Sequence, residues 1–117
     1  MNVSFYVDGN PVSLNNAYFN RGRGRTMTSE ARAWKELVAW HARAVHKGKP
    51  SKGRIELSIW LDFPDKRRRD IDNFAKIACD AMKGIAYADD SQIDHLHLHR
   101  RHGTPGIAVH VRDLPLD

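Results

Sequence analysis

Residues 54–84 read RIELSIWLDFPDKRRRDIDNFAKIACDAMKG, and two different periodicities meet in this one stretch. From Arg54 to Phe63 apolar and polar side chains alternate, which is typical of a β-strand with one buried face. From Asp70 to Gly84 the apolar residues recur at helical spacing, and Gly84 stands where a helix commonly ends. The stretch therefore predicts a strand and then a helix, joined by a strongly basic segment.

The sequence before this stretch predicts a long helix preceded by a loop. Residues 20–26 read NRGRGRT, and their composition predicts a mobile basic loop. Thr28 or Ser29 is expected to cap a helix that runs to about His46. Beside its core stripe, this helix carries a second apolar stripe formed by Ala33, Leu37, Trp40 and Ala44. So wide an apolar face indicates burial on two sides, as in a dimer.

Three further strands are expected from the alternation of apolar and polar residues. They are Val3–Val7, Gln92–His102 and Ile107–Arg112, and a Thr-Pro-Gly turn is expected to join the last two as a hairpin. The order of elements is then β-loop-α-β-α-β-β. This order predicts an α+β fold, in which a small mixed β-sheet packs with two main helices.

The composition limits the class of protein. With 117 residues and 13.4 kDa, we expect a single domain over residues 1–117. No apolar run approaches the roughly 18 residues that cross a bilayer, and the first residues have no signal-peptide core, so no membrane association is expected. Cys79 is the single cysteine, which excludes an internal disulfide and a cysteine-based zinc site. We expect Cys79 to be buried and inert, in a reducing cytoplasmic setting.

The charge points to nucleic acid as the partner. Nineteen Lys and Arg residues against fourteen Asp and Glu residues give a net charge of +5 at pH 7. A small basic domain of this kind is typical of nucleic-acid-binding proteins. Two groups of arginines are expected to follow the phosphate backbone, one in the glycine-rich loop and one before the second helix. They are Arg21, Arg23 and Arg25, and Arg67, Arg68 and Arg69.

The acidic residues gather in one stretch, because seven aspartates lie within residues 65–94. Asp70 is expected at the N-cap of the second helix, where its side chain can fold back toward Asp72 in the first turn. Two carboxylates so close repel each other unless a cation joins them, and Mg²⁺ suits one or two carboxylates with water and phosphate oxygens. With a third acid from the Asp pair at residues 89–90, the pattern predicts a metal site for phosphodiester hydrolysis.

Two neighbours of these acids are expected to play different roles. Lys76 lies one helical turn after Asp72, where it can stabilise charge that develops on a phosphate. Asp80 lies two turns, roughly 12 Å, from Asp72, which is too far to bind the same ion. We expect Asp80 to be structural and to pair with Lys76 or an arginine. An alternative remains open, in which all these acids serve only caps and ion pairs and the protein binds branched DNA without hydrolysis.

The chain resembles the RusA family of Holliday junction resolvases. The resemblance rests on residues 67–82 (RRRDIDNFAKIACDAM), on Gly84 and on residues 89–92 (DDSQ). It continues toward the N-terminus in residues 11–16 (PVSLNN) and 20–29 (NRGRGRTMTS), so that it spans nearly the whole chain. The combination of D-x-D-N-x2-K-x3-D with D-D-x-Q makes the resemblance specific.

The resemblance implies a homodimeric endodeoxyribonuclease that depends on Mg²⁺, with Mn²⁺ as a substitute, and cuts four-way DNA junctions by paired symmetric nicks. It implies that Asp70, Asp72 and Asp90 bind the metal and act in catalysis, together with Lys76. A nuclease for forks or flaps remains an alternative, because contacts to the DNA backbone are governed by shape rather than sequence.

Three histidines alternate along the strand expected at Gln92–His102. His95, His97 and His99 share one face of this strand, opposite the leucines between them. Side chains on one face of a strand are about 7 Å apart, which is long for three ligands to one ion. We therefore expect an exposed polar face, with DNA nearby or with solvent, rather than a metal site.

Overall fold

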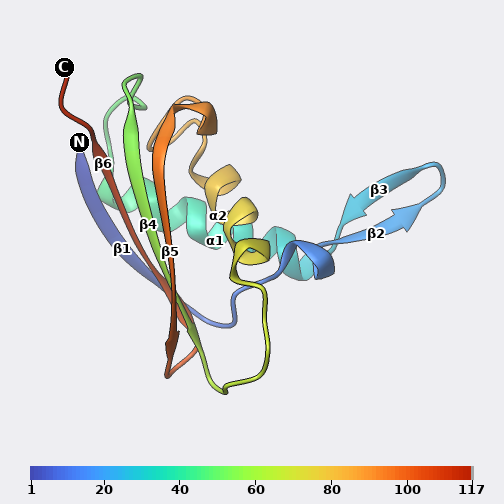
Figure 1. The fold of residues 1–117 in the computed structure, drawn as a ribbon. Helices are drawn as coiled ribbons and strands as arrows, with labels where there is room; N and C mark the ends of the chain where they lie inside the picture. The colour runs from blue at the N-terminus through green and yellow to red at the C-terminus, as the bar shows by residue number, and fades with distance from the viewer. Residues whose placement is uncertain (117) are drawn as a thin grey trace.

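The computed structural model, which describes residues 1–116, has the predicted α+β architecture (Figure 1). The main sheet is mixed, with the spatial order β1-β6-β4-β5. Its strands are β1 (Asn2–Asp8), β4 (Ile55–Phe63), β5 (Ile93–His102) and β6 (Gly106–Asp113). The helices are α1 (Ser29–Val45) and α2 (Ala75–Met82), accompanied by the 3₁₀ turns η1 (Leu14–Asn16), η2 (Ile71–Phe74) and η3 (Asp90–Gln92).

The pairing of the last two strands differs from the prediction. β6 pairs antiparallel with β1 and β4, whereas β5 pairs in parallel with β4 at the edge, so the predicted hairpin of β5 with β6 is wrong. The composition of the two strands explains why β6 lies inside the sheet and β5 at its edge. β6 buries Ile107, Val109 and Val111 and fits an inner position, whereas most of the histidine-rich β5 is exposed and fits an edge.

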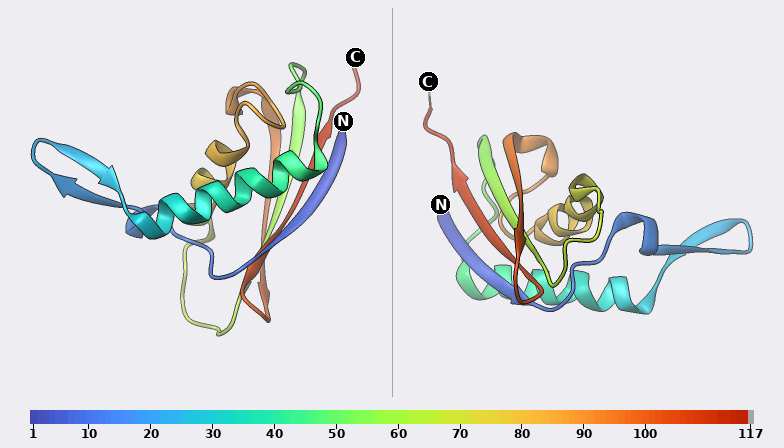
Figure 2. Two further views of the ribbon diagram at one scale, coloured as in Figure 1. Left: turned by 180° about the vertical axis from the view of Figure 1, so that it is seen from behind. Right: turned by 60° about the horizontal axis from the view of Figure 1, so that its bottom comes forward.

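Both helices cover the same face of the main sheet, and the opposite face is open (Figure 2). On the covered face, β4 contributes an unbroken row of buried side chains, which are Ile55, Leu57, Ile59, Leu61 and Phe63. α1 packs on them through Trp34, Val38 and Ala42. Its second apolar stripe faces solvent, with Leu37 40% and Trp40 62% exposed. Within residues 1–116, neither helix combines the length and the apolar character that a bilayer crossing requires.

The N-terminal cap of α1 confirms the predicted start of this helix. Thr28 is the N-cap residue, and its hydroxyl accepts a hydrogen bond of 3.1 Å from the backbone N–H of Ala31. The end of α2 is confirmed as well. Gly84 follows the C-cap residue Lys83 and has a φ of +82°, a conformation that favours glycine.

The predicted mobile basic loop is instead an antiparallel hairpin, formed by β2 (Tyr18–Arg21) and β3 (Gly24–Met27). Arg21 pairs with Gly24, which leaves a two-residue connection. Gly22 has a φ of +60° at the first position of this connection, where tight hairpin turns need glycine. The hairpin projects away from the body of the molecule beyond the N-terminus of α1 (Figures 1 and 2).

Candidate active site

A cavity of about 380 Å³ lies between α2 and the edge strand β5, and it brings together part of the predicted site. Three of the predicted residues, Asp72, Lys76 and Asp90, line this cavity. Asp72 comes from η2, Lys76 from α2 and Asp90 from the first position of η3. The remaining wall is formed by Ala75, Cys79, Ile93 and Leu96. The cavity therefore has a polar rim of two carboxylates and one ammonium group above a mainly apolar wall.

Lys76 pairs with one carboxylate of the cavity and with one outside it. Its Nζ donates to Asp90 Oδ2 at 3.2 Å and lies 3.2 Å from Asp80 Oδ1. The predicted pairing of Asp80 with Lys76 is therefore confirmed. The hydrogen bonds to Asp80 and then to Asp90 raise the pKa of Lys76 above its usual value. Lys76 thus stays protonated at neutral pH and supplies a positive charge beside Asp90.

Asp70 lies apart from this cavity. It occupies the predicted N-cap position, but its side chain makes no capping hydrogen bond, so the predicted fold-back over the first turn is wrong. The turn begins as a 3₁₀ turn rather than an α-helix, and Asp70 borders a neighbouring hollow together with Arg68 and Asn73. Among residues 1–116, no three His, Cys, Asp or Glu side chains are grouped closely enough to hold a metal ion. A divalent ion at the cavity would rely on Asp72, Asp90, water and substrate oxygens.

A capping box fixes the position of Asp90. The side chain of Asp89 accepts from the Ser91 N–H at 3.1 Å, and Gln92 Oε1 accepts from the Asp89 N–H at 2.8 Å. Gln92 is buried, and its Nε2 donates to the backbone carbonyls of Ser51 and Gly53 at 2.8 Å each. The structural roles of Asp89 and Gln92 were not predicted, although D-x-x-Q is the spacing of a capping box.

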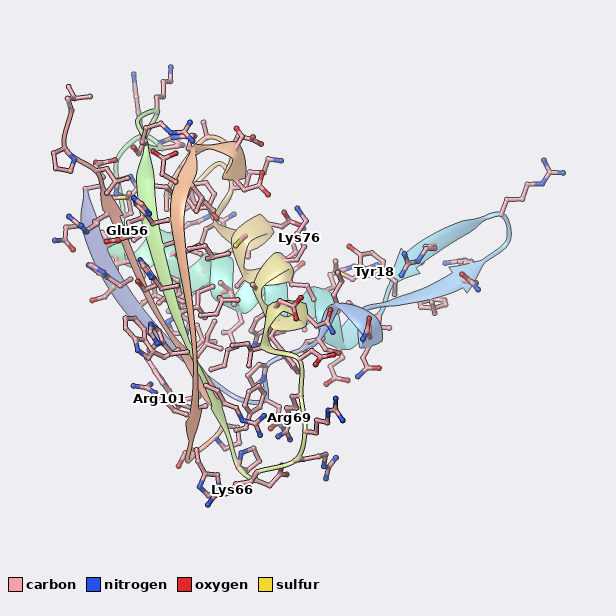
Figure 3. The ribbon with its side chains drawn as sticks, in the orientation of Figure 1. Tyr18, Glu56, Lys66, Arg69, Lys76 and Arg101 are labelled. Atoms are coloured by element: carbon pink, nitrogen blue, oxygen red, sulfur yellow. The ribbon has the colours of Figure 1, made fainter. Side chains whose placement is uncertain are left out.

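The Arg67–Arg69 segment divides into structural and free cations. Arg69 Nη1 donates to Asp65 Oδ1 at 2.9 Å, and its guanidinium lies over the Phe63 ring, 4.4 Å from the ring centroid (Figure 3). This pairing with Arg69 lowers the pKa of Asp65. Arg68 is exposed and has no ion-pair partner among the described residues. Arg69 therefore holds the segment in place. Arg67 is exposed and its guanidinium lies 3.8 Å from Asp65 Oδ2, so Arg68 is the one cation of the three without an ion pair in residues 1–116.

The hairpin arginines are all exposed, as a contact with DNA would require. Arg21 ends β2, Arg23 lies in the connection and Arg25 belongs to β3. Arg25 lies over the ring of Tyr18, with 4.9 Å between its guanidinium carbon and the ring centroid. Because two paired strands carry them, these arginines have a defined direction rather than the freedom of a loop.

The three histidines of β5 lie on the open face of the sheet and are exposed, as predicted. The rings of His95 and His97 stack with centroids 6.4 Å apart, and His99 stacks on Trp60 at 5.2 Å. His97 Nε2 lies 2.9 Å from a carboxylate oxygen of Glu56. This face is therefore a network of aromatic and ionic contacts within the sheet.

Cys79 forms part of the cavity wall and is buried, as predicted. Burial raises the pKa of its thiol to about 11, so the thiolate is not populated near neutral pH. The neighbouring Tyr87 is fully buried and donates a hydrogen bond of 2.5 Å to the Cys79 carbonyl. Cys79 is accordingly a packing residue of α2.

Comparison with known proteins decides the family. A family model described as Endodeoxyribonuclease RusA matches residues 8–112, which is most of the chain. The chain belongs to the RusA endodeoxyribonuclease family. Like the other members, it is classed as an endodeoxyribonuclease, and the matched residues include every part of the cavity described above.

Curated RusA relatives come from phages and bacteria. A crossover junction endodeoxyribonuclease of Enterobacteria phage HK97 is 30% identical over 118 residues, which covers all of this chain and 98% of the relative. The protein of the same name from Escherichia coli is 38% identical over 84 residues, or 68% of either chain. That of Aquifex aeolicus is 29% identical over 115 residues, covering 94% of this chain and 90% of the relative.

Proposed function

We propose that this RusA-family protein is a Mg²⁺-dependent endonuclease that resolves four-way DNA junctions by paired, symmetric hydrolysis of phosphodiester bonds. The observation that carries the proposal is the cavity, which is lined by Asp72, by Asp90 and by the protonated Lys76 that pairs with Asp90. The names of the full-length relatives support the substrate. The single buried cysteine fits action in the reducing cytoplasm.

The donor set of the cavity fits a hard divalent cation. Carboxylate oxygens are the ligands that Mg²⁺ and Mn²⁺ prefer, and each ion accepts one or two of them beside water and phosphate oxygens. Asp72 and Asp90 would supply them, and the RusA resemblance adds Asp70, which immediately precedes η2 and borders the neighbouring hollow. The bound ion would activate a water molecule and neutralise charge on the phosphate.

The remaining residues bind and orient the DNA strand. Lys76, whose Nζ already faces Asp90, would hold a phosphate oxygen and stabilise the negative charge that develops on it. Capping of η3 by Asp89 and Gln92 would keep Asp90 directed at the cavity. The exposed arginines at positions 67 and 68 and on the hairpin would contact neighbouring phosphates.

The proposal includes a homodimer. Two cuts related by the two-fold symmetry of a junction require two equivalent sites, and a two-fold dimer presents one site per protomer in that arrangement. The exposed apolar stripe of α1 and the open face of the sheet are both available for a second protomer.

The experiment is a strand-nicking assay on a labelled four-way junction and on its matched linear duplex, with Mg²⁺ or with EDTA. Wild-type protein is compared with Asp72→Asn and with Asp94→Asn, a control that removes the same charge from an exposed ion pair on β5. We expect symmetric nicks on the junction only, lost with EDTA and in Asp72→Asn, and retained in Asp94→Asn.

Two other outcomes would overturn the proposal. Binding without cutting under every divalent metal would favour a non-catalytic module for branched DNA. Single nicks on forks or flaps, with intact four-way junctions, would favour a nuclease of another specificity. In either case the carboxylates of the cavity would need a different explanation.

A further inference from the structure

A basic groove runs between α1 and α2, outside the candidate active site. Two adjoining hollows, of about 510 and 340 Å³, follow the side of α1 that faces α2, and both are bordered by Arg43, Gly84 and Ile85. The cations of the basic groove are Arg32, Lys35, Arg43 and Lys47. None of these four has an ion-pair partner among residues 1–116, and none belongs to the arginine groups assigned to DNA above.

The positions of these cations follow from the helical period. Arg32, Lys35 and Arg43 are separated by three and eight residues, which places them along one side of α1. From Arg32 to Arg43 the helix rises about 16 Å. Lys47 extends the row just beyond the C-terminus of α1. The result is a line of positive charge rather than a single point.

Two acids, Asp80 and Glu36, border the groove, and both lie at the first hollow. Asp80 lies 3.2 Å from Lys76, which it shares with Asp90. The groove lysine Lys83 pairs with Asp89 at 2.9 Å. Glu36 is then the one unpaired acid of the two hollows within the described residues, against four unpaired cations. The groove consequently keeps a net positive charge that solvent alone has to balance.

The groove is continuous with both DNA-directed parts of the molecule. Met27, the last residue of β3, borders the same hollow as Arg32, so the row of cations continues into the arginine-bearing hairpin. Asp80 borders the groove and contacts Lys76 of the cavity, so α2 alone separates the two. In the left view of Figure 2 the hairpin and α1 follow one another, with α2 alongside.

We propose that the basic groove binds the phosphate backbone of a duplex arm of the junction, a few base pairs from the strand in the cavity. Phosphates of one strand repeat every 3.4 Å along the duplex axis, so about 16 Å of groove matches about five base pairs. The inference rests on the proposed function, because it names where the arm of that same substrate lies.

The test removes two groove cations that make no side-chain hydrogen bond or ion pair in residues 1–116. The variant Lys35→Ala/Arg43→Ala is compared with Lys49→Ala/Lys52→Ala, which has the same net charge and alters the loop after α1. Arg32 is left intact, because its guanidinium donates to the Met27 carbonyl at the base of the hairpin. Thermal melting checks that both variants fold, as expected because alanine favours the helix at the half-buried Lys35 and the exposed Arg43.

Binding is measured on junctions with uncharged methylphosphonate linkages placed either about three to eight nucleotides from the crossover or at the arm ends. We expect the groove variant to bind an unmodified junction on the order of tenfold more weakly, and its salt slope to fall by about two, since each phosphate contact contributes about 0.9. Methylphosphonates near the crossover should weaken junction binding by wild type and by the control variant, but not by the groove variant.

Two results would overturn the groove as a DNA contact. One is an equal loss of junction affinity in both double variants. The other is that methylphosphonates near the crossover weaken binding by the groove variant as much as they weaken binding by wild type. Unchanged junction binding by the groove variant would also overturn the proposal, and an acidic protein would then be the partner that fits the groove. The nicking rate at saturating protein should match wild type in the groove variant. If wild type cuts no junction, the proposed function fails, while the methylphosphonate comparison still decides the groove.

Discussion

The carboxylates of the open sheet face and Asp72 of the cavity have opposite surroundings. On the sheet face, Asp62 accepts two hydrogen bonds from Arg101, at 2.7 and 3.0 Å, and Glu56 accepts one from Arg112 at 2.7 Å. In the cavity, Asp72 has no hydrogen-bond or ion-pair partner in the part of the chain that the structure describes. The sheet-face acids are each held by hydrogen bonds from an arginine of the protein, whereas Asp72, within residues 1–116, has both oxygens free for an external ligand.

This difference separates a structural acid from a candidate ligand. An acid satisfied by arginine stabilises the fold and offers few free lone pairs to an external cation. An acid without a partner adds little to stability, and beside other acids it destabilises the fold until a cation arrives. Exposure alone would not distinguish them, because Asp94 on β5 is also exposed and is held by Arg54 at 2.6 Å.

The largest effect is expected from a substitution of the unpaired acid in the cavity. Asp72→Asn should lower the rate of junction nicking at least ~100-fold, because a metal ligand supplies several kcal/mol of transition-state stabilisation. Junction binding should stay unchanged or tighten, since a negative charge near phosphate is lost. Nicking assays and gel shifts measure the two properties. Loss of binding together with nicking would mean that Asp72 supports the fold instead.

The corresponding substitution on the sheet face should affect stability rather than cutting. Asp62→Asn should lower the free energy of unfolding by about 1–3 kcal/mol, because it removes a charge from a buried acid bonded to Arg101 and Tyr6. Nicking should stay within about twofold of wild type. Urea denaturation measures the stability, with Asp94→Asn as a control for which an exposed pair predicts at most ~1 kcal/mol. A cutting defect without a stability loss would reverse the assignment.

A third prediction concerns the capping of η3, which positions Asp90 at the cavity. Gln92→Ala should cost about 1–2 kcal/mol of stability, because it removes three part-buried hydrogen bonds, which join Gln92 to the Asp89 N–H and to the carbonyls of Ser51 and Gly53. It should also slow nicking by releasing Asp90. Gln92→Glu keeps the acceptor for the Asp89 N–H and should fall between alanine and wild type in both measurements. Wild-type cutting by the alanine variant would show that Asp90 needs no such support.

The smallest effect is a pH dependence of stability that arises on the sheet face. Hydrogen bonds from His97 and Arg112 lower the pKa of Glu56 from 4.5 to about 2. Because the folded pKa lies below the unfolded one, this contribution is complete above about pH 4.5 and is lost as the pH falls toward 2. Glu56→Gln should therefore flatten the melting temperature over this window. A parallel curve for wild type and variant would exclude Glu56 as the source.

Local patterns predicted most of the fold, and the two failures are one strand pairing and one short hairpin. The alternation of β4 and the stripe of α1 depend on neighbours in sequence, and both elements were predicted within a residue or two. The partner of β6 depends on which strand can be buried on the sheet, so the short turn after β5 misled the prediction. The β2–β3 hairpin was missed because its R-G-R-G composition resembles a loop.

The site was predictable to a similar degree. The spacing of Asp72 and Lys76 placed them on adjacent faces, and both line the same cavity. The direction of the Asp70 side chain was not predictable, because it depends on whether the first turn is α or 3₁₀. The partner of Lys76 at position 90 comes from a segment beyond α2, and only the tertiary fold brings it to hydrogen-bonding distance.

The most direct test of the contrast between the two regions is Mn²⁺ binding, measured by electron paramagnetic resonance with and without a four-way junction. Wild type, Asp72→Asn and Asp62→Asn are compared at equal concentration. We expect wild type and Asp62→Asn to bind the ion with similar affinity, and Asp72→Asn to lose binding. Retained binding in Asp72→Asn, or its loss in a folded Asp62→Asn protein, would contradict the assignment of the cavity as the metal site.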